Sequence, residues 1–314
     1  MSLQSQLKAA SPGRPGVVTV GTFDGVHIGH ARLFEATIEL AHNTGADSIA
    51  ITFKYPPREL LDPARSVPHL GPLNERVVLI KDLGVDQVIE VDFDDQIRNI
   101  GADDFVRILM AELDMKGLVL GPGATVGHDR GGDEARMKAL SEDLGFELRV
   151  VQPAQVNGVV ARSSTIRTAL SSGDMSTASE LLGRTFSITG TVTEGDRRGR
   201  TLGFPTANIK PDPSGVIPAD GIYACFVTTD SGRYLAATSI GVRPTFDKGP
   251  RIIEPFLLDF NEDLYGQQIT VEFVKRLRGE ERFDSVDALI VQMNNDVSDT
   301  RQLLGTAHQQ SGSR

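Results

Sequence analysis

The sequence lacks several features on which whole classes of proteins depend. Cys225 is the only cysteine among 314 residues, which excludes an intramolecular disulfide and a cluster of thiolate metal ligands. No stretch contains the roughly 18 consecutive apolar residues of a membrane-spanning helix. The first 16 residues also lack an apolar run that could form the core of a signal peptide. We therefore expect a cytoplasmic protein without a membrane partner.

Positive charge is scarce as well. Lysine and arginine number 32 against 42 aspartates and glutamates, which gives a formal net charge of -10. This balance argues against a protein that a general electrostatic field holds to nucleic acid, so we predict no nucleic-acid partner. Any polyanionic ligand must be bound by a few residues at a local site.

The first half of the chain alternates strand-like and helical patterns. Apolar strand-like runs cover residues 16–21, 47–53, 86–93, 117–121 and 147–153. Helical patterns between them cover residues 31–45, 74–84 and 102–114. Strands that are joined through helices predict an α/β fold with a Rossmann-like parallel sheet covered on both faces.

After Arg167 the pattern changes. Two short helices are expected over residues 163–183, and from Phe186 onward apolar and polar residues alternate with a period of two. The alternating segments are residues 186–195, 221–230, 233–241, 251–260 and 267–277. They predict a small antiparallel β-barrel, covered by a C-terminal helix from about Ser285 to Leu304 and followed by a frayed polar tail.

This change in periodicity predicts two domains. The length is sufficient for each domain to bury a core of its own. We place the boundary near Leu182, so that the domains cover residues 1–182 and 183–314.

The segment GTFDGVHIGH, residues 21–30, lies where the first strand ends and a helix begins. Ligands of parallel α/β sheets bind at the carboxyl ends of the strands, where a helix N-terminus offers unpaired N–H groups to an anion. The spacing of His27 and His30 puts both imidazoles on one face of that helix, where they could stabilise charge on phosphates. Three glycines let the backbone approach a ligand closely: Gly21, Gly25 and Gly29.

This segment resembles the signature of nucleotidylyltransferases, in the form found in bifunctional riboflavin kinase/FMN adenylyltransferases, also called bacterial FAD synthetases. The resemblance implies that the first domain is a nucleotidylyltransferase, in which His27 and His30 bind ATP phosphates and stabilise the transition state of adenylyl transfer. It implies further ATP contacts for Gly21, Phe23, Asp24, Gly25 and Gly29.

A second segment of the first domain, RSSTIR, resembles the same family. Ser163, Ser164 and Arg167 match its Ser/Thr cluster and its Ile-Arg pair, while Arg162 stands where a serine is usual. Hydroxyls at a helix start and a guanidinium one turn later can clamp a polyphosphate. The three matching residues are therefore expected to bind ATP.

The second domain contains GDRRGRTLGFPTANI, residues 195–209, a glycine- and arginine-rich loop followed by P-T-A-N that is specific to riboflavin kinases. The resemblance implies that the Thr206 hydroxyl and the Asn208 side-chain oxygen bind Mg²⁺ together with ATP phosphates. Magnesium prefers such hard oxygen ligands. Further nucleotide contacts are implied at Gly195, Arg200, Gly203 and Pro205.

Glu254, in the segment IIEPFLLDF, stands where that family has its general base. The 5′-hydroxyl of riboflavin is a poor nucleophile until its proton is accepted, so a carboxylate placed against it suits the reaction. The second domain is thus expected to be a riboflavin kinase-like barrel with Glu254 as its catalytic base.

Two stretches depart from the family. In GPGATVGHDRGGD, residues 121–133, Gly123, Ala124 and Val126 replace an acid and two aromatic residues of the flavin pocket, although Gly127, Arg130, Gly132 and Asp133 fit. After the second strand Pro56 replaces a histidine, and we hypothesise that the ring of Tyr55 stacks on the flavin instead. Aromatic contacts contribute about 0.5–1.5 kcal/mol each beyond area burial, so these departures bear on FMN binding.

The sequence as a whole predicts a cytoplasmic bifunctional enzyme. It would phosphorylate riboflavin to FMN with ATP and Mg²⁺, and then adenylylate FMN to FAD with release of pyrophosphate. Its ligands would be riboflavin, FMN, FAD and ATP, and assembly into a homo-oligomer stays open. Two alternatives stay open too. One is a riboflavin kinase whose first half no longer adenylylates FMN or uses another phosphate acceptor, and the other is a nonenzymatic flavin or nucleotide sensor.

Overall fold

The computed structural model describes residues 1–54, 67–128, 131–195, 202–242 and 251–311, with side chains of the last helix described as far as Gly305. Packing divides the chain into two units, Met1–Ser163 and Ser164–Arg314. Each unit has its own sheet, and each is described by itself.

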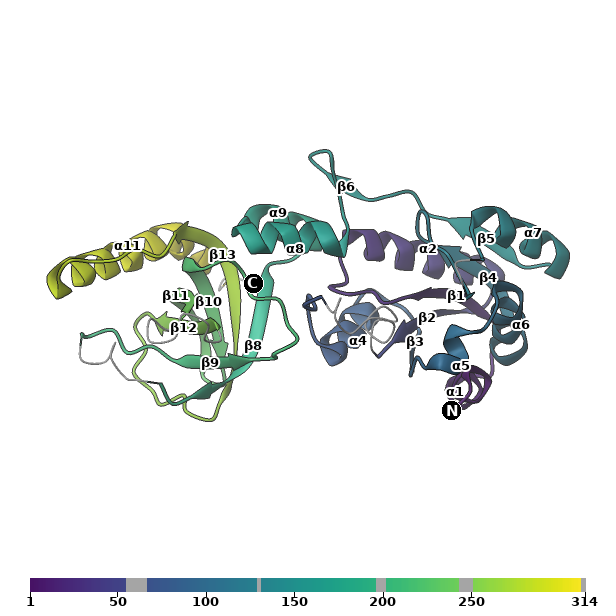
Figure 1. Ribbon diagram of the computed structural model, residues 1–314, viewed down its shortest axis with the longest axis horizontal. Coiled ribbons are helices and arrows are strands. Elements are labelled where there is room, and N and C mark those ends of the chain that lie inside the picture. The colour runs from purple at the N-terminus through teal and green to yellow at the C-terminus, as the bar shows by residue number, and fades with distance from the viewer. Residues whose placement is uncertain (55–66, 129–130, 196–201, 243–250, 312–314) are drawn as a thin grey trace. The chain divides into compact units, whose positions relative to one another are not determined.

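The first unit is built on a parallel sheet with the strand order β3-β2-β1-β4-β5 (Figure 1). The strands are β1 (Gly16–Gly21), β2 (Asp47–Phe53), β3 (Gln87–Val91), β4 (Met115–Leu120) and β5 (Glu147–Val150). The chain leaves β1 toward β2 and β3 and then returns to place β4 on the other side of β1. In sheets of this kind, ligands bind at the carboxyl ends of the strands where the direction reverses, which here is the end of β1. The predicted parallel sheet is confirmed.

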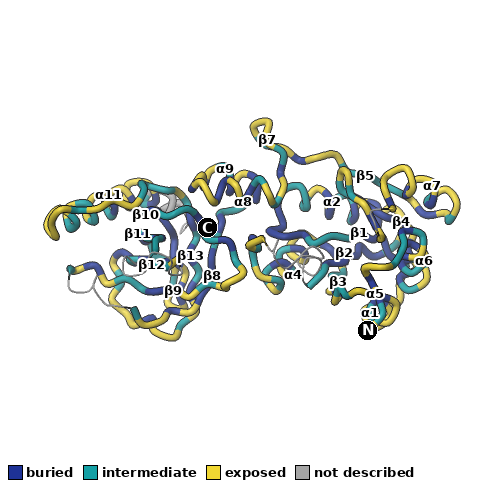
Figure 2. The backbone as a smooth tube through the Cα atoms, in the orientation of Figure 1, coloured by how far each residue is buried: buried dark blue, intermediate teal, exposed yellow. Residues whose placement is uncertain are grey.

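Helices cover both faces of this sheet. They are α1 (Leu3–Ala10), α2 (Ile28–Thr44), α4 (Leu73–Asp82), α5 (Asp95–Arg98), α6 (Ala102–Leu113) and α7 (Glu134–Leu144). Val17 and Val18 are adjacent and both fully buried, but Val17 packs with Phe34 of α2 whereas Val18 packs with Leu109 of α6. Successive residues of a strand point to opposite faces, so the sheet is buried on both sides, as Figure 2 shows. A short hairpin, β6 (Gln155–Val156) and β7 (Val159–Val160), follows the sheet.

The second unit is a closed antiparallel barrel with the order β10-β11-β12-β9-β8-β13. Its strands are β8 (Phe186–Thr193), β9 (Asn208–Pro211), β10 (Gly221–Thr229), β11 (Gly232–Val242), β12 (Arg251–Leu257) and β13 (Gln268–Arg278). The predicted barrel is confirmed, and the short strand β9, which the sequence analysis did not predict, closes it by pairing with both β8 and β12. Two helices precede the barrel, α8 (Ser163–Ser172) and α9 (Met175–Leu182).

Large apolar side chains fill the barrel. The rings of Tyr223 and Phe273 are fully buried and meet edge to face, and the Tyr223 hydroxyl donates to the carbonyl of Ala219. Burial raises the pKa of the Cys225 thiol to about 12, so the single cysteine is no nucleophile at neutral pH.

The final helix is α11 (Val286–Ser311). Leu304 packs it against Ala224 and Phe226 of β10. The predicted covering helix is thus present, but the helix continues to Ser311 where the sequence analysis expected a frayed tail after Leu304. None of the helices in the described part of the chain is long and apolar enough to cross a membrane.

Candidate active sites

The turn between β1 and α2 has an unusual backbone at the carboxyl edge of the first sheet. Left-handed φ angles of 49°, 78° and 37° occur at Phe23, Gly25 and Val26. A Cβ atom on Gly25 would also lie 2.6 Å from Cδ1 of Leu70, so glycine is required there for two reasons. Asp24 is buried, and its Oδ1 accepts a hydrogen bond from the Leu70 N–H at 2.9 Å. Asp24 and Gly25 therefore fix the shape of the turn.

His27 is the N-cap of α2. Its Nδ1 accepts hydrogen bonds from the backbone N–H groups of Gly29 at 3.1 Å and His30 at 3.4 Å, while Nδ1 of His30 accepts from the His27 N–H at 3.4 Å. The two rings stack with their centroids 3.7 Å apart. Because both Nδ1 atoms accept, each neutral ring keeps its hydrogen on Nε2. The helix start therefore combines two Nε2–H donors with the positive end of a helix dipole, which suits an anion.

The charge state of His30 follows from its surroundings. Burial first, and then electrostatic interactions with His27 and Arg76, hold the pKa of His30 well below its ordinary value. His30 is therefore neutral at neutral pH, and its Nδ1 stays available to accept from the His27 N–H. A proton on that Nδ1 would break the reciprocal cap.

Other residues of the motif shape the space around the two rings. The ring of Phe23 meets the His30 ring edge to face, with 5.4 Å between the centroids. A Cβ on Gly21 would lie 2.6 Å from the Phe23 ring, and a Cβ on Gly29 would lie 3.0 Å from the His27 ring. The absence of side chains at Gly21 and Gly29 thus permits the packing of these rings.

Ser163, the first residue of α8, lies against the same turn. Its hydroxyl donates a hydrogen bond to the Asp24 carbonyl at 3.0 Å. The structure thus brings Ser163 to the motif of residues 21–30. Ser164 and Arg167 follow on α8 as members of the second unit.

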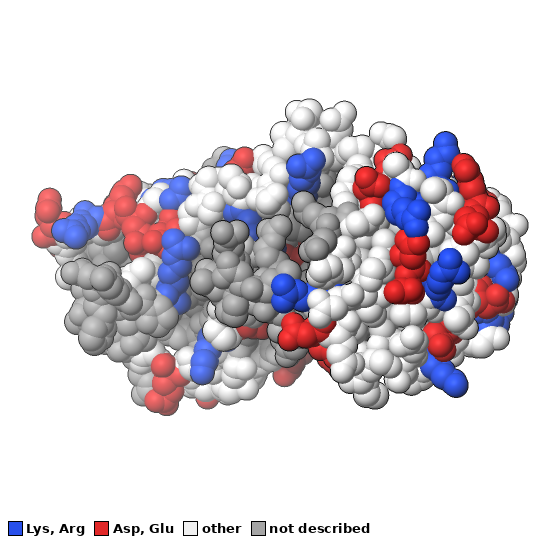
Figure 3. Space-filling view, turned by 45° about the vertical axis from the view of Figure 1, so that its right-hand side comes forward, with Lys and Arg blue, Asp and Glu red and all other residues white. Residues whose placement is uncertain are grey.

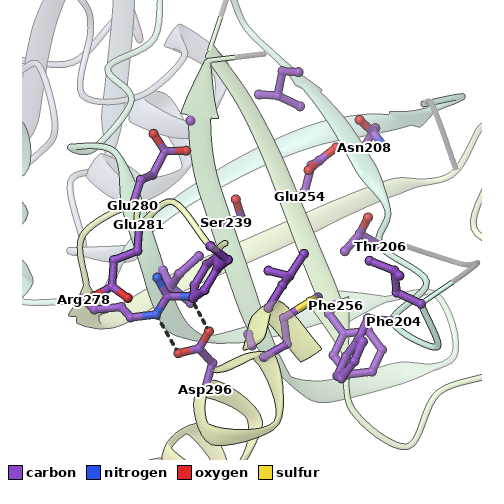
Figure 4. A pocket seen from close by; sticks show the side chains of 18 of the residues that line it. Phe204, Thr206, Asn208, Ser239, Glu254, Phe256, Arg278, Glu280, Glu281 and Asp296 are labelled. Atoms are coloured by element: carbon purple, nitrogen blue, oxygen red, sulfur yellow. Dashed lines mark hydrogen bonds and ion pairs between the residues drawn. The ribbon is translucent and has the colours of Figure 1, made fainter. Parts of the chain in front are cut away.

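The described residues of the barrel unit enclose, among others, a first cavity of about 390 Å³ and a second of about 430 Å³, and Thr206 and Asn208 line both of them. The first cavity, drawn in Figure 4, is also lined by Phe204, Ser239, Glu254, Phe256, Arg278, Glu280, Phe283, Met293 and Asp296. The second is also lined by Gly195, Pro205, Ala207, Phe260, Asp263 and Tyr265. A ligand in one cavity would therefore meet a ligand in the other across Thr206 and Asn208.

Asn208 is held in a tight position at this shared wall. It is buried, and a Cβ on Gly195 would lie only 2.1 Å from its Nδ2. Its Oδ1 is buried and has no hydrogen-bond partner within the described residues. A buried carbonyl oxygen without a partner suits a hard cation, so the residues present fit Mg²⁺. The neighbouring Ala207 N–H donates to the Pro255 carbonyl at 2.9 Å, which fixes this segment to β12.

Glu254 lies on β12 opposite Ser239 of β11. Along β12, Ile253 is fully buried in the barrel wall while Glu254 is half-buried and faces the first cavity. Figure 4 shows the Glu254 carboxylate and the Asn208 amide beside each other on neighbouring strands. The predicted base and one predicted metal ligand thus meet in one place.

The remaining nucleotide contacts predicted for the barrel are less uniform. Gly195 and Pro205 line the second cavity, and Gly203 has a left-handed φ of 87° that favours glycine. Arg200 lies outside the described residues.

Comparison with known proteins covers both units. Residues 10–165 match the FAD synthetase family, and residues 182–304 match the riboflavin kinase family. The bifunctional riboflavin kinase/FMN adenylyltransferase of Pseudomonas fluorescens is 36% identical over 289 residues, which is 91% of this chain and 92% of that protein. The chain belongs to the bifunctional riboflavin kinase/FMN adenylyltransferase family. The enzyme of this name from Escherichia coli K12 is 34% identical over 291 residues, 92% of this chain and 93% of that protein.

Membership of this family gives the activity. The enzyme phosphorylates riboflavin to FMN with ATP and adenylylates FMN to FAD. The fold is shared with the crystal structure of a macrolide-efflux protein from Streptococcus pneumoniae, with a TM-score of 0.87, 31% identity, and coverage of 94% of this chain and 97% of that one. The relatives from Pseudomonas fluorescens and Escherichia coli match both halves of the chain and are named as bifunctional enzymes. They therefore argue against the two alternatives, a kinase whose first half no longer adenylylates FMN and a sensor without enzymatic activity.

In the segment that departs from the FAD synthetase pattern, the described residues make contacts of their own. Val126 belongs to the core of the first unit, and it exchanges two backbone hydrogen bonds with Gly132, at 3.0 and 2.9 Å. A Cβ on Gly127 would lie 2.4 Å from the Ala102 backbone nitrogen. Gly123 is exposed with a left-handed φ of 66°. Val126 thus packs inward instead of offering a ring to a ligand.

Three residues of this comparison, Tyr55, Pro56 and Arg130, lie outside the described residues. The stacking role suggested for Tyr55 therefore stays a hypothesis. Asp133 caps α7 by accepting from the Arg136 N–H at 2.9 Å, so its agreement with the family has a structural reason.

The first cavity also has a charged wall that the sequence analysis missed. Arg278, the last residue of β13, forms a two-pronged ion pair with Asp296 of α11, at 2.9 and 2.8 Å (Figure 4). Glu280 lines the same cavity, and burial, with a smaller effect of Asp220, raises its pKa. In the sequence, Arg278 and Asp296 are two among several charged residues of a strand and a helix. That pattern does not reveal that two residues so far apart in the chain form an ion pair.

Charges on the outer surface have a different character. On the face seen in Figure 3, basic and acidic side chains alternate over the first unit. The ion pairs of the first unit include those of Arg149 with Glu39 and of Arg136 with Asp103. This alternation accords with a protein that binds its anionic ligands at local sites.

Proposed function

We propose that each reaction has its own active site, phosphorylation in the barrel and adenylylation at the turn between β1 and α2. The observation that carries the proposal is the position of Thr206 and Asn208 between two cavities, one of which contains Glu254. The family matches support the same assignment, because the riboflavin kinase match lies in the barrel half. We further propose that the enzyme is cytoplasmic and that its domains are residues 1–182 and 183–314.

In the kinase site, riboflavin would occupy the first cavity and ATP the second. Glu254 would accept the proton of the 5′-hydroxyl, whose oxygen forms a bond to the γ-phosphorus while the bond to the β-phosphate oxygen breaks. The Thr206 hydroxyl and the Asn208 Oδ1 would hold Mg²⁺, which neutralises phosphate charge when bound. Gly195, Pro205 and the segment that includes Arg200 and Gly203 would enclose the nucleotide.

In the adenylyltransferase site, a phosphate oxygen of FMN would attack the α-phosphorus of ATP, and pyrophosphate would leave. His27 and His30 would donate their Nε2–H groups to phosphate oxygens, so that growing negative charge meets fixed donors. Ser163, Ser164 and Arg167 would complete the phosphate clamp. The ATP pocket would be shaped by Gly21, Phe23, Asp24, Gly25 and Gly29. Asp24 would act there chiefly by supporting the turn, through the hydrogen bonds that its side chain and its carbonyl accept.

The kinase assignment is tested by Glu254→Gln. This change keeps the size of the side chain and removes the base, so the kcat of FMN formation should fall about 10²- to 10⁴-fold while riboflavin still binds. FMN production is measured by chromatography and binding by flavin fluorescence. A variant with parental kcat would exclude Glu254 as the base.

A further inference from the structure

Arg76, on α4, is a buried cation in the first unit. The residue is 4% exposed, and its Nη1 donates to the Phe53 carbonyl at 3.0 Å and to Oγ1 of Thr52 at 3.4 Å. Its Nε is buried without a hydrogen-bond partner, and no ion pair within the described residues includes it. Burial of a charge without a carboxylate partner is costly, and an arginine on a helix usually avoids this cost by staying in water.

A hydrogen-bond chain connects Arg76 to the phosphate-binding motif. Thr52, which is fully buried near the end of β2, accepts from Arg76 and donates its own hydroxyl hydrogen to the Thr22 carbonyl at 3.2 Å. Thr22 is the second residue of the motif of residues 21–30. The guanidinium is thus two hydrogen bonds away from the backbone that begins the turn.

The charge of Arg76 also acts on the motif. It is one of three causes that keep the pKa of His30 low, after burial and His27. Burial lowers the pKa of Arg76, whereas the negative charges of Asp24 in the turn and Glu90 of β3 raise it and so favour the charged form. Among the described residues, the titratable groups that shift these pKa values are thus His27 and Arg76 for His30, and Asp24 and Glu90 for Arg76. A neutral His30 keeps the Nδ1 acceptor on which the reciprocal cap depends.

We propose that Arg76 is a positioning residue for adenylyl transfer, which steadies the turn at Thr22 through Thr52 and places a permanent positive charge behind the ATP phosphates. A fixed charge in a water-poor interior acts over a longer range than one in water and needs no reorganisation during the reaction. The inference rests on the proposed binding of ATP phosphates at His27 and His30.

Three variants separate the charge from the hydrogen bonds. Arg76→Met removes both, Arg76→Lys keeps the charge, and Thr52→Val breaks the chain while it leaves Arg76 in place. We expect Arg76→Met to lower the kcat of FAD formation from FMN by at least about tenfold and to raise the pH at which the His30 ring titrates in NMR spectra. Arg76→Lys should recover most of both properties. Thr52→Val should lower kcat less and leave the His30 titration unchanged.

The outcomes are distinguishable from a failure of the proposed site. Riboflavin kinase activity of each variant serves as a control for the rest of the chain, and thermal unfolding shows whether the first unit is folded. Parental kcat in folded Arg76→Met, with an unmoved His30 titration, would overturn the proposal and leave Arg76 a structural residue. If instead a His27→Ala/His30→Ala variant formed FAD at the parental rate, the proposed site itself would be wrong.

Discussion

At the scale of single residues, the position of a glycine explains how a proposed metal ligand is placed. Gly195 and Asn208 are 13 positions apart in the sequence, and the structure presses the Asn208 amide against the Gly195 Cα. Because Gly195 has no side chain, Asn208 can keep its Oδ1 at the wall between the two cavities. The motif thus contains the proposed metal ligand Asn208 and a second residue, Gly195, that makes room for it.

We therefore predict that Gly195→Ala impairs the kinase through Asn208. The new methyl group would lie 2.1 Å from Nδ2 and 2.8 Å from Oδ1 of Asn208, so that side chain must move. Titration of kinase activity with Mg²⁺ should show that more metal is needed for half-maximal rate and that the maximal rate is lower. Gly305→Ala is the matched control, because a Cβ at Gly305 would meet nothing within 4 Å. Equal Mg²⁺ dependence in the two variants would contradict the account.

At the scale of elements, an ion pair joins the last strand of the barrel to the last helix. The side chains of Arg278 and Asp296 are 15% and 6% exposed, and Gln292 also donates to Asp296 at 3.1 Å. Asp296 favours the charged form of Arg278 and raises its pKa. Helix α11 contributes Leu289 and Met293 to the first cavity, so this pair also helps to position one wall of the proposed riboflavin site.

We predict that Asp296→Ala destabilises the barrel unit by about 3–5 kcal/mol, because it leaves the Arg278 charge buried without its partner. The KM for riboflavin should rise in the same variant, since the wall formed by α11 loosens. Asp259→Ala is a matched control: Asp259 pairs with Arg301 of the same helix, but its side chain is 72% exposed, so its loss should cost at most about 1 kcal/mol. Denaturant unfolding gives the free energy of unfolding of each variant. Similar losses in the two variants would show that burial of the pair does not matter.

The accuracy of prediction also differed between elements for physical reasons. The strands of the parallel sheet are continuous apolar runs and were predicted closely. Helix α1 was not predicted, because its only signals are Leu3 and Leu7, one turn apart in a polar segment, which become fully buried against α6 and β3. Strand β9 is four residues long and contains Pro211, so its pairing with β8 and β12 depends on barrel closure and leaves no periodic pattern.

The residues of the candidate sites also fall into two groups, those that the sequence predicted and those that it did not. Motifs predicted His27, His30, Thr206, Asn208 and Glu254, and the structure brings the last three to one cavity and stacks the first two. Arg76 gave no such signal, because an arginine on an amphipathic helix resembles any solvated residue until the fold buries it. Nor could periodicity reveal that Val126 packs into the core, since one apolar residue in a glycine-rich loop has no pattern around it.

At the scale of the whole molecule, the chain contains two units with separate cores. Packing groups α8 and α9 with the barrel, whereas the riboflavin kinase match begins at residue 182. The two helices contact the barrel directly: the Ala219 N–H donates to the Leu170 carbonyl at 3.0 Å, and Gly173 lies close against Arg276. They therefore support the barrel although they precede the matched region.

Two fragments test this organisation. We predict that residues 163–314 and residues 183–314 both phosphorylate riboflavin, because every proposed kinase residue lies after residue 183. The shorter fragment should unfold at a lower temperature, since it loses the buried side chains of Met175, Leu181 and Leu182. Thermal melting and FMN formation are measured side by side. A folded but inactive longer fragment would contradict independent sites.

The central claim is that two separate sites make FMN and FAD, and product analysis of two complementary variants tests it most directly. His27→Ala/His30→Ala and Glu254→Gln are incubated with ATP and Mg²⁺ and with either riboflavin or FMN, and the flavins are separated by chromatography. We predict that the histidine variant converts riboflavin to FMN but makes no FAD, and that Glu254→Gln makes almost no FMN from riboflavin but converts supplied FMN to FAD at the parental rate. Loss of both activities in either folded variant, or FAD formation by the histidine variant, would contradict the account.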